Sequence, residues 1–133
     1  MSVEAAADQP PFAKFLGGRI THISPQRVTG ELPVTEELSN RNKILHGGAV
    51  MAFADNLGGT GATANLKPGQ STITIESKTN FFAGVEIGDV AKAECTPLHI
   101  GRTTMVWQTR VTRGDGKLAA LVTQTQIVFV REK

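Results

Sequence analysis

The sequence contains no tyrosine, one tryptophan and one cysteine. Proteins that stack nucleic-acid bases need several aromatic side chains and a basic surface, whereas here Lys and Arg are scattered and the net charge is only +2. The single thiol, Cys95, excludes an internal disulfide, and the three histidines form no cluster at metal-ligand spacing. We therefore expect no nucleic-acid partner, no metal and no cofactor.

Long hydrophobic runs are also missing. No apolar stretch approaches the ~20 residues of a membrane-spanning helix, and the opening MSVEAAADQPP lacks the basic and apolar regions of a signal peptide. A chain of 133 residues with 40% hydrophobic content can build one core. We expect a single domain over residues 1–133 with residues 1–9 disordered, no membrane partner, and a location in the reducing cytoplasm.

The hydrophobic period changes once along the chain. From Ala49 to Leu66 apolar and small residues recur at helical spacing, and the following Lys-Pro-Gly ends this predicted helix. One long helix followed by antiparallel strands predicts an α+β fold with the helix on one face of the sheet. The other predicted elements are a helical turn at Phe12–Leu16, a loop at Glu36–Leu45, and strands at Arg19–Ser24, Arg27–Pro33, Ser71–Phe82, Asp89–Thr96, Thr103–Arg113 and Lys117–Val130, the last two joined as a hairpin.

Asp55 is the only ionisable residue of the predicted helix. The side opposite the apolar stripe carries small residues instead of the Glu, Lys and Arg of a surface helix. Gly58, Gly59 and Gly61 each cost roughly 1 kcal/mol of helix stability against Ala, which suggests close approach of another backbone or a ligand. We expect a helix buried nearly all round, with a carboxylate that has a function. The alternative is an Asp55 at an exposed edge, where it only adds solubility.

A polar motif precedes this helix. The run from Asn40 to Gly48 reads Asn-Arg-Asn-Lys-Ile-Leu-His-Gly-Gly, and Asp55 follows. This pattern resembles the hotdog-fold acyl-CoA thioesterases, in which His-Gly-Gly opens the central helix, an acid lies nine residues beyond the His, and Asn or Gln lies six before it. Asp at the acid position resembles the phenylacetyl-CoA type. The resemblance implies a hotdog fold, an antiparallel sheet wrapped around one long central helix.

Weaker matches extend the resemblance from about Gly18 to Val130. Thr74 falls where the family often places Ser or Thr near the catalytic acid. The segment Asn80–Gly84 resembles the family's strand end but lacks a proline that is often found there. Arg102, after a glycine, matches a basic residue at the start of the next-to-last strand.

The resemblance implies hydrolysis of an acyl-CoA with an aromatic or a medium- or long-chain acyl group. Asp55 then acts as a general base on water or attacks directly to form an anhydride. Gly47 donates its backbone N–H to the thioester oxygen at the positive end of the helix. His46 supports that oxygen or orders the turn, and Asn40 positions the water or the carbonyl. The plain alternatives are a histidine bonded to backbone and an ordinary loop asparagine.

Three further residues are assigned to substrate binding. Thr74 is expected to hydrogen-bond Asp55 or the water, Gly48 belongs to the glycine pair at the helix start, and Arg102 meets the CoA phosphates. A plain strand threonine and a solvated strand-end arginine are the alternatives.

Helix geometry bears on assembly. His46 and Asp55 are separated by ~13 Å along the helix axis and lie on opposite sides of it, because nine steps of ~100° amount to half a turn beyond two full turns. Two antiparallel copies of the helix can bring Gly47 of one chain to Asp55 of the other. We expect a homodimer with shared sites, and the resemblance adds a tetramer of paired dimers.

Two other functions compete with hydrolysis. A hotdog hydratase or dehydratase would need an Asp-x-Asn-Pro-x-x-His-like segment, which the sequence lacks. A non-catalytic acyl-CoA-binding domain would keep the fold but would not need Asp55.

Overall fold

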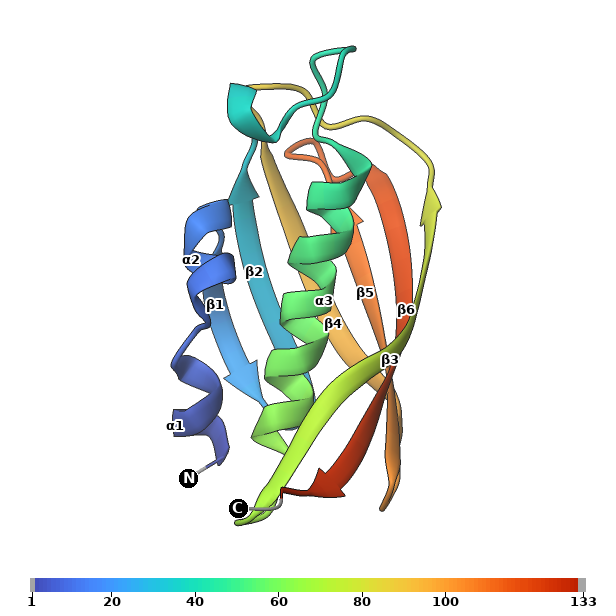
Figure 1. The fold of residues 1–133 in the computed structure, drawn as a ribbon. Coiled ribbons are helices and arrows are strands. Elements are labelled where there is room, and N and C mark those ends of the chain that lie inside the picture. Colours follow the sequence, from blue (N-terminus) through green and yellow to red (C-terminus); the bar gives the residue numbers. More distant parts are fainter. Residues whose placement is uncertain (1, 132–133) are drawn as a thin grey trace.

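One six-stranded antiparallel sheet wraps around the long helix α3 (Gly47–Ala64) in the computed structural model, which describes residues 2–131 (Figure 1). The strand order is β1-β2-β4-β5-β6-β3. The predicted α+β class and the hotdog architecture are therefore confirmed. The remaining elements are α1 (Ser2–Ala7), α2 (Pro11–Leu16), the 3-10 helix η1 (Glu36–Leu38), β1 (Arg19–Ser24), β2 (Arg27–Pro33), β3 (Gln70–Phe81), β4 (Val90–Ile100), β5 (Thr104–Thr112) and β6 (Leu118–Val130).

Most element boundaries lie within two residues of their predicted positions, and two of the differences have a clear structural cause. Helix α3 begins at Gly47 instead of Ala49, because the side chain of His46 caps its first turn. Strand β4 continues past Thr96 to Ile100, because a bulge between Pro97 and His99 lets the pairing with β5 resume beyond the proline.

The expectation that residues 1–9 are disordered is wrong where the structure describes them. Helix α1 packs on α3 and β1, and its Ala6 is buried. Gln9 then anchors the segment: Nε2 donates to Ala6 O at 2.8 Å and Thr60 Oγ1 at 3.3 Å, while Asn56 Nδ2 donates to Gln9 Oε1 at 2.7 Å. Helix α1 thus forms without a long hydrophobic stripe, because its alanines have a high helix propensity and the hydrogen bonds of Gln9 fix the segment to α3. Met1 lies outside the described residues.

The core fills the space between α3 and the inner face of the sheet. Trp107 on β5 is fully buried, and its ring lies so close to Gly61 that a Cβ there would be 2.7 to 3.1 Å from it. At Gly58 a Cβ would lie 2.2 to 2.5 Å from the Gln124 amide. The close neighbours of these two glycines are thus side chains of the sheet, not the backbone or ligand that we expected. Gly59 has open space around it.

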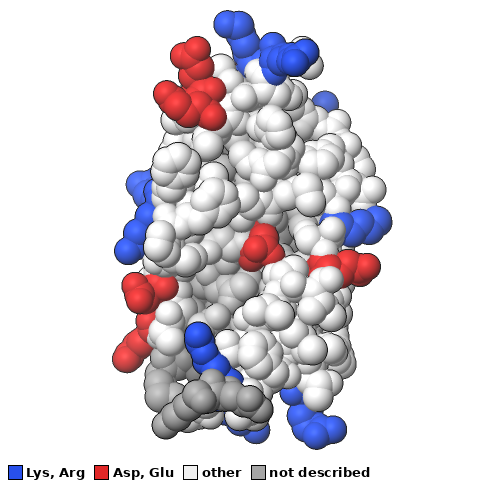
Figure 2. Space-filling view, viewed as in Figure 1, with Lys and Arg blue, Asp and Glu red and all other residues white. Residues whose placement is uncertain are grey.

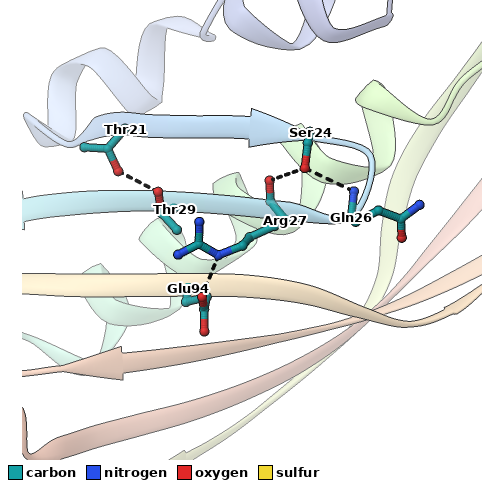
Figure 3. Close-up of polar contacts among 6 residues, drawn as sticks. All are labelled: Thr21, Ser24, Gln26, Arg27, Thr29 and Glu94. Atoms are coloured by element: carbon teal, nitrogen blue, oxygen red, sulfur yellow. Dashed lines mark hydrogen bonds and ion pairs between the residues drawn. The ribbon is translucent and has the colours of Figure 1, made fainter.

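The outer face of the sheet is polar. On β1 and β2 the hydroxyls of Thr21 and Thr29 are 2.6 Å apart, and Arg27 Nε donates to Glu94 Oε2 at 2.6 Å (Figure 3). Exposed pairs of this kind stabilise a fold only weakly, so the α3 side of the sheet carries the core. Within residues 2–131, no helix has the length and apolar character to cross a bilayer.

Candidate active site

One side of α3 is open to solvent in the single chain, because six strands enclose only part of the helix. Asp55 is exposed on this side, so the prediction of a helix buried nearly all round does not hold within one chain. Ile73 and Ile75 of the neighbouring strand β3 are each 56% exposed. Figure 2 shows this face with most of its charges at the rim and an acidic group near the middle.

Asn40 fixes the loop that leads into α3. Its Oδ1 accepts hydrogen bonds from the N–H groups of Asn42 at 2.9 Å and Ile44 at 3.3 Å, and its own N–H donates to Ile44 O at 2.8 Å. These bonds close a tight turn. The Nδ2 group of Asn40 has no hydrogen-bond partner among the described residues, so it can donate to a ligand.

His46 and the two glycines form the start of α3. Nδ1 of His46 accepts a hydrogen bond from Gly48 N at 2.8 Å. This bond assigns the proton of a neutral imidazole to Nε2 and occupies the N–H of Gly48. Gly47 is the first helical residue, and its N–H has no acceptor within residues 2–131. Of the two glycines, Gly47 is thus the one with a free donor at the positive end of the helix.

A cavity of about 370 Å³ lies beside Gly47. Phe81 forms one wall, and its ring would lie 3.1 Å from a Cβ added at Gly47. The cavity therefore combines apolar walls with a free N–H at Gly47 and a free amide at Asn40. Its other lining residues come from the loop before α3, the first turn of α3, the segment after β3 and the start of β6: Ile44, Leu45, Val50, Phe82, Ala83, Gly84, Val85, Ala119 and Ala120.

Asp55 lies in the middle of α3 and is held from the sheet. The structure contains the predicted bond from Thr74, whose Oγ1 donates to Asp55 Oδ1 at 2.6 Å. Gln124 Nε2 donates to the same oxygen at 3.2 Å. Oδ2 has no hydrogen-bond partner among the described residues. Asp55 borders a second cavity of about 370 Å³, between α1, α3 and β3, which Gly59 and Thr74 also line.

Within one chain the predicted site residues fall into separate groups. Asn40, His46 and Gly47 lie at the start of α3, whereas Asp55 lies ~12 Å further along the helix axis and lines a different cavity. Arg102 joins neither group. It is exposed in the turn between β4 and β5, at the end of the sheet opposite the start of α3 (Figure 1).

Sequence reasoning missed two residues that contact this site, Gln124 and Gln126 of β6. Both are buried and follow Val122 in the inward-facing row of the strand. Gln126 Nε2 donates to Thr74 Oγ1 at 2.6 Å. The sequence could have indicated them: the alternation of β6 places both amides on its inward face, and buried amides need hydrogen-bond partners in the core.

Comparisons with known proteins identify the family and the fold. The model of the thioesterase superfamily matches residues 42–120. A 1,4-dihydroxy-2-naphthoyl-CoA thioesterase of Arabidopsis thaliana is 31% identical over 83% of this chain and 68% of its own length. A mutant thioesterase from Pseudomonas aeruginosa, 25% identical, superposes with a TM-score of 0.87 over 97% of this chain and 92% of its own. A hypothetical thioesterase from Streptococcus pneumoniae, solved with coenzyme A, shares the fold (TM-score 0.78, 22% identity, 87% and 88% covered).

Proposed function

The chain belongs to the thioesterase superfamily and is a thioester hydrolase, and we propose that it converts acyl-CoA to free acid and CoA with Asp55 as the catalytic carboxylate. One observation carries the proposal: α3 begins with a free N–H at Gly47 and holds a carboxylate, fixed by Thr74, about two turns further on. The names of two similar proteins support CoA as the carrier. We propose an aromatic or a medium- or long-chain acyl group.

The start of α3 would stabilise the oxyanion. When a nucleophile adds to the thioester carbon, negative charge develops on the carbonyl oxygen, and the Gly47 N–H would donate to it. One such donor is typically worth ~3–4 kcal/mol in the transition state. His46 would act as the helix cap: its Nδ1 accepts the hydrogen bond of the Gly48 N–H and so fixes the turn that presents Gly47. Asn40 would use its free amide to orient the carbonyl or the water.

Asp55 would supply the nucleophile through Oδ2. As a general base, Oδ2 takes a proton from water while the water oxygen bonds to the acyl carbon, the C–S bond breaks, and the CoA thiolate is protonated. Alternatively, Oδ2 attacks the acyl carbon itself, the C–S bond breaks and the CoA thiolate leaves and is protonated, and water then hydrolyses the resulting anhydride to the free acid and the Asp55 carboxylate. Both routes use the oxygen that Thr74 and Gln124 leave free.

A second copy of the chain would complete the site. Strand β3 is an edge of the sheet and, among residues 2–131, pairs only with β6, so its other edge is open to pairing with a strand of a partner chain. The exposed Ile73 and Ile75 and the open side of α3 would be buried in the same contact. We propose a two-fold dimer that brings Gly47 of one chain to Asp55 of its partner, and a tetramer built from two such dimers.

Two finer assignments belong to the same proposal. Arg102, far from Gly47 in its own chain, would meet the CoA phosphates of a site in the assembled protein. The enzyme would act in the cytoplasm, where a chain with one unpaired cysteine suits the reducing conditions.

The proposal is tested by a hydrolysis screen. Short, medium, long and aromatic acyl-CoAs are offered, and the released thiol is measured. We expect at least one good substrate, and we expect Asp55→Asn and Asp55→Ala to remain folded while losing about 10²–10⁴-fold in kcat, the usual value of a positioned base. No hydrolysis of any acyl-CoA, or near-normal turnover by either variant, would overturn the assignment.

A further inference from the structure

Two buried amide side chains of β6 lie next to Asp55 and its partner Thr74. Gln124 and Gln126 are each 1% exposed, in a row of β6 that otherwise carries apolar residues. A buried amide is costly unless its polar atoms find partners, and an apolar side chain would fill the same space without that cost. Both side chains donate hydrogen bonds to Asp55 or to the Thr74 hydroxyl beside it.

Gln124 holds the helix and the carboxylate together. Its Nε2 donates both to Asp55 O at 3.3 Å and to Asp55 Oδ1 at 3.2 Å. The amide fits only because position 58 is glycine, since a Cβ there would lie 2.2 to 2.5 Å from it. Gly58 lowers the stability of the helix, but it leaves the space through which Gln124 reaches Asp55.

Gln126 sets the direction of the neighbouring hydroxyl. Its Nε2 can only donate, so Thr74 Oγ1 must accept at 2.6 Å. The single proton of Thr74 is then free to point to Asp55 Oδ1, also at 2.6 Å. The amide itself is oriented from the other side, because Thr72 Oγ1 donates to Gln126 Oε1 at 3.1 Å.

We propose that Gln124 and Gln126 are positioning residues of this active site, Gln124 acting directly on Asp55 and Gln126 acting through Thr74. Together they bring two donors to Oδ1 and leave Oδ2 as the oxygen that reacts. This inference rests on the proposed function. Gln124 lines neither of the two cavities, and Gln126 borders the Asp55 cavity but is only 1% exposed, so we expect the removal of either amide to lower kcat more than it changes KM.

The test replaces each amide with methionine, which has a similar shape but no donor. On the best substrate of the screen, Gln124→Met is expected to lower kcat roughly tenfold or more, because it removes a bond to a charged group. Gln126→Met is expected to lower it about three- to tenfold. The matched control is Thr109→Val, which changes a buried polar residue of β5 that has no hydrogen bond to Asp55, Thr74 or either glutamine. It should keep the wild-type kcat.

The same substitutions in a Thr74→Val background separate positioning from packing. Because Gln126 acts through the Thr74 hydroxyl, Gln126→Met should cause no further loss of kcat there, whereas Gln124→Met should still cause its full loss. A Thr74→Ser background, which keeps the hydroxyl, should restore the effect of Gln126→Met. Melting temperatures are recorded for every variant, and Gln124→Leu and Gln126→Leu replace any methionine variant that does not fold.

Wild-type kcat in both glutamine variants would overturn the inference while leaving the thioesterase assignment intact. A full additive loss for Gln126→Met in the Thr74→Val background would overturn the relay through Thr74. A wild-type protein that hydrolyses no acyl-CoA would instead overturn the proposed function.

Discussion

The carboxylate of Asp55 uses its two oxygens differently. Oδ1 accepts hydrogen bonds from Thr74 and Gln124, and both donors belong to strands of the sheet, β3 and β6, not to α3 itself. Fixing one oxygen of a carboxylate in this way orients the other without blocking it, which is what a positioned base or nucleophile requires. At the residue scale, the site is therefore built from the sheet as much as from the helix.

Cys95 illustrates a reactive group that the fold keeps inactive. Burial raises the pKa of its thiol to about 12, so the thiol stays protonated at neutral and mildly alkaline pH. We expect no reaction of the native protein with a thiol reagent at pH 8, and one reactive thiol per chain after unfolding in guanidinium. The measurement is a colorimetric thiol titration. Rapid modification of the native protein would show that Cys95 is accessible.

At the scale of elements, the proposed role of the start of α3 can be tested by removing the backbone N–H of Gly47. Proline is favoured at the first helical position, and His46 already has the extended backbone (φ −61°, ψ 137°) that precedes proline. Gly47→Pro should therefore keep the helix while deleting the proposed oxyanion donor, and kcat should fall by about 10²–10³-fold.

The matched control for this change is Gly47→Ala. It places a Cβ against the ring of Phe81, as proline does, but keeps the N–H. We expect a far smaller loss of kcat than with proline, and circular dichroism should show the same helix content in both. Equal losses in the two variants would mean that crowding at Phe81, not the missing donor, lowers the activity.

Two glycines of α3 make a contrasting pair. In Gly61→Ala the new Cβ meets the rigid, fully buried ring of Trp107, and overpacking of this kind costs about 1–3 kcal/mol. In Gly58→Ala the Cβ meets the flexible amide of Gln124, which can move aside but then leaves Asp55. Gly61→Ala should lower the melting temperature and keep kcat, whereas Gly58→Ala should lower kcat. The reverse pattern would contradict the role assigned to Gln124.

The elements themselves could largely be predicted from the sequence, but their contacts could not. The change from a helical period to a period of two identified α3 and the strands after it, because periodicity is a local property. The contact of Gln126 with Thr74 depends on the pairing of β3 with β6, including a bulge between Thr74 and Glu76. No local pattern encodes that register. Helix α1 was missed because three bonds of Gln9 anchor it, not a hydrophobic stripe.

At the scale of the whole molecule, the single chain contains two incomplete halves of the proposed site. The free N–H of Gly47 and the carboxylate of Asp55 line separate cavities, and no bending of one helix can bring them together. A partner chain would explain both observations: it would bring a second Gly47 to Asp55, and it would cover the exposed Asp55, Ile73 and Ile75. A shared site thus accounts both for the separation of Gly47 from Asp55 and for an open face whose charges lie mostly at the rim.

The shared-site model is tested most directly by the activity of a mixed dimer. One chain carries Asp55→Asn and the other Gly47→Pro, the two are co-expressed with different tags, and the heterodimer is purified through both. One of its sites then receives both lesions and the other receives neither, so we expect about half the wild-type kcat per dimer from two-fold symmetry, although each parent homodimer is inactive. A verified heterodimer as inactive as its parents would show that each site is built within one chain, and would contradict the shared-site model.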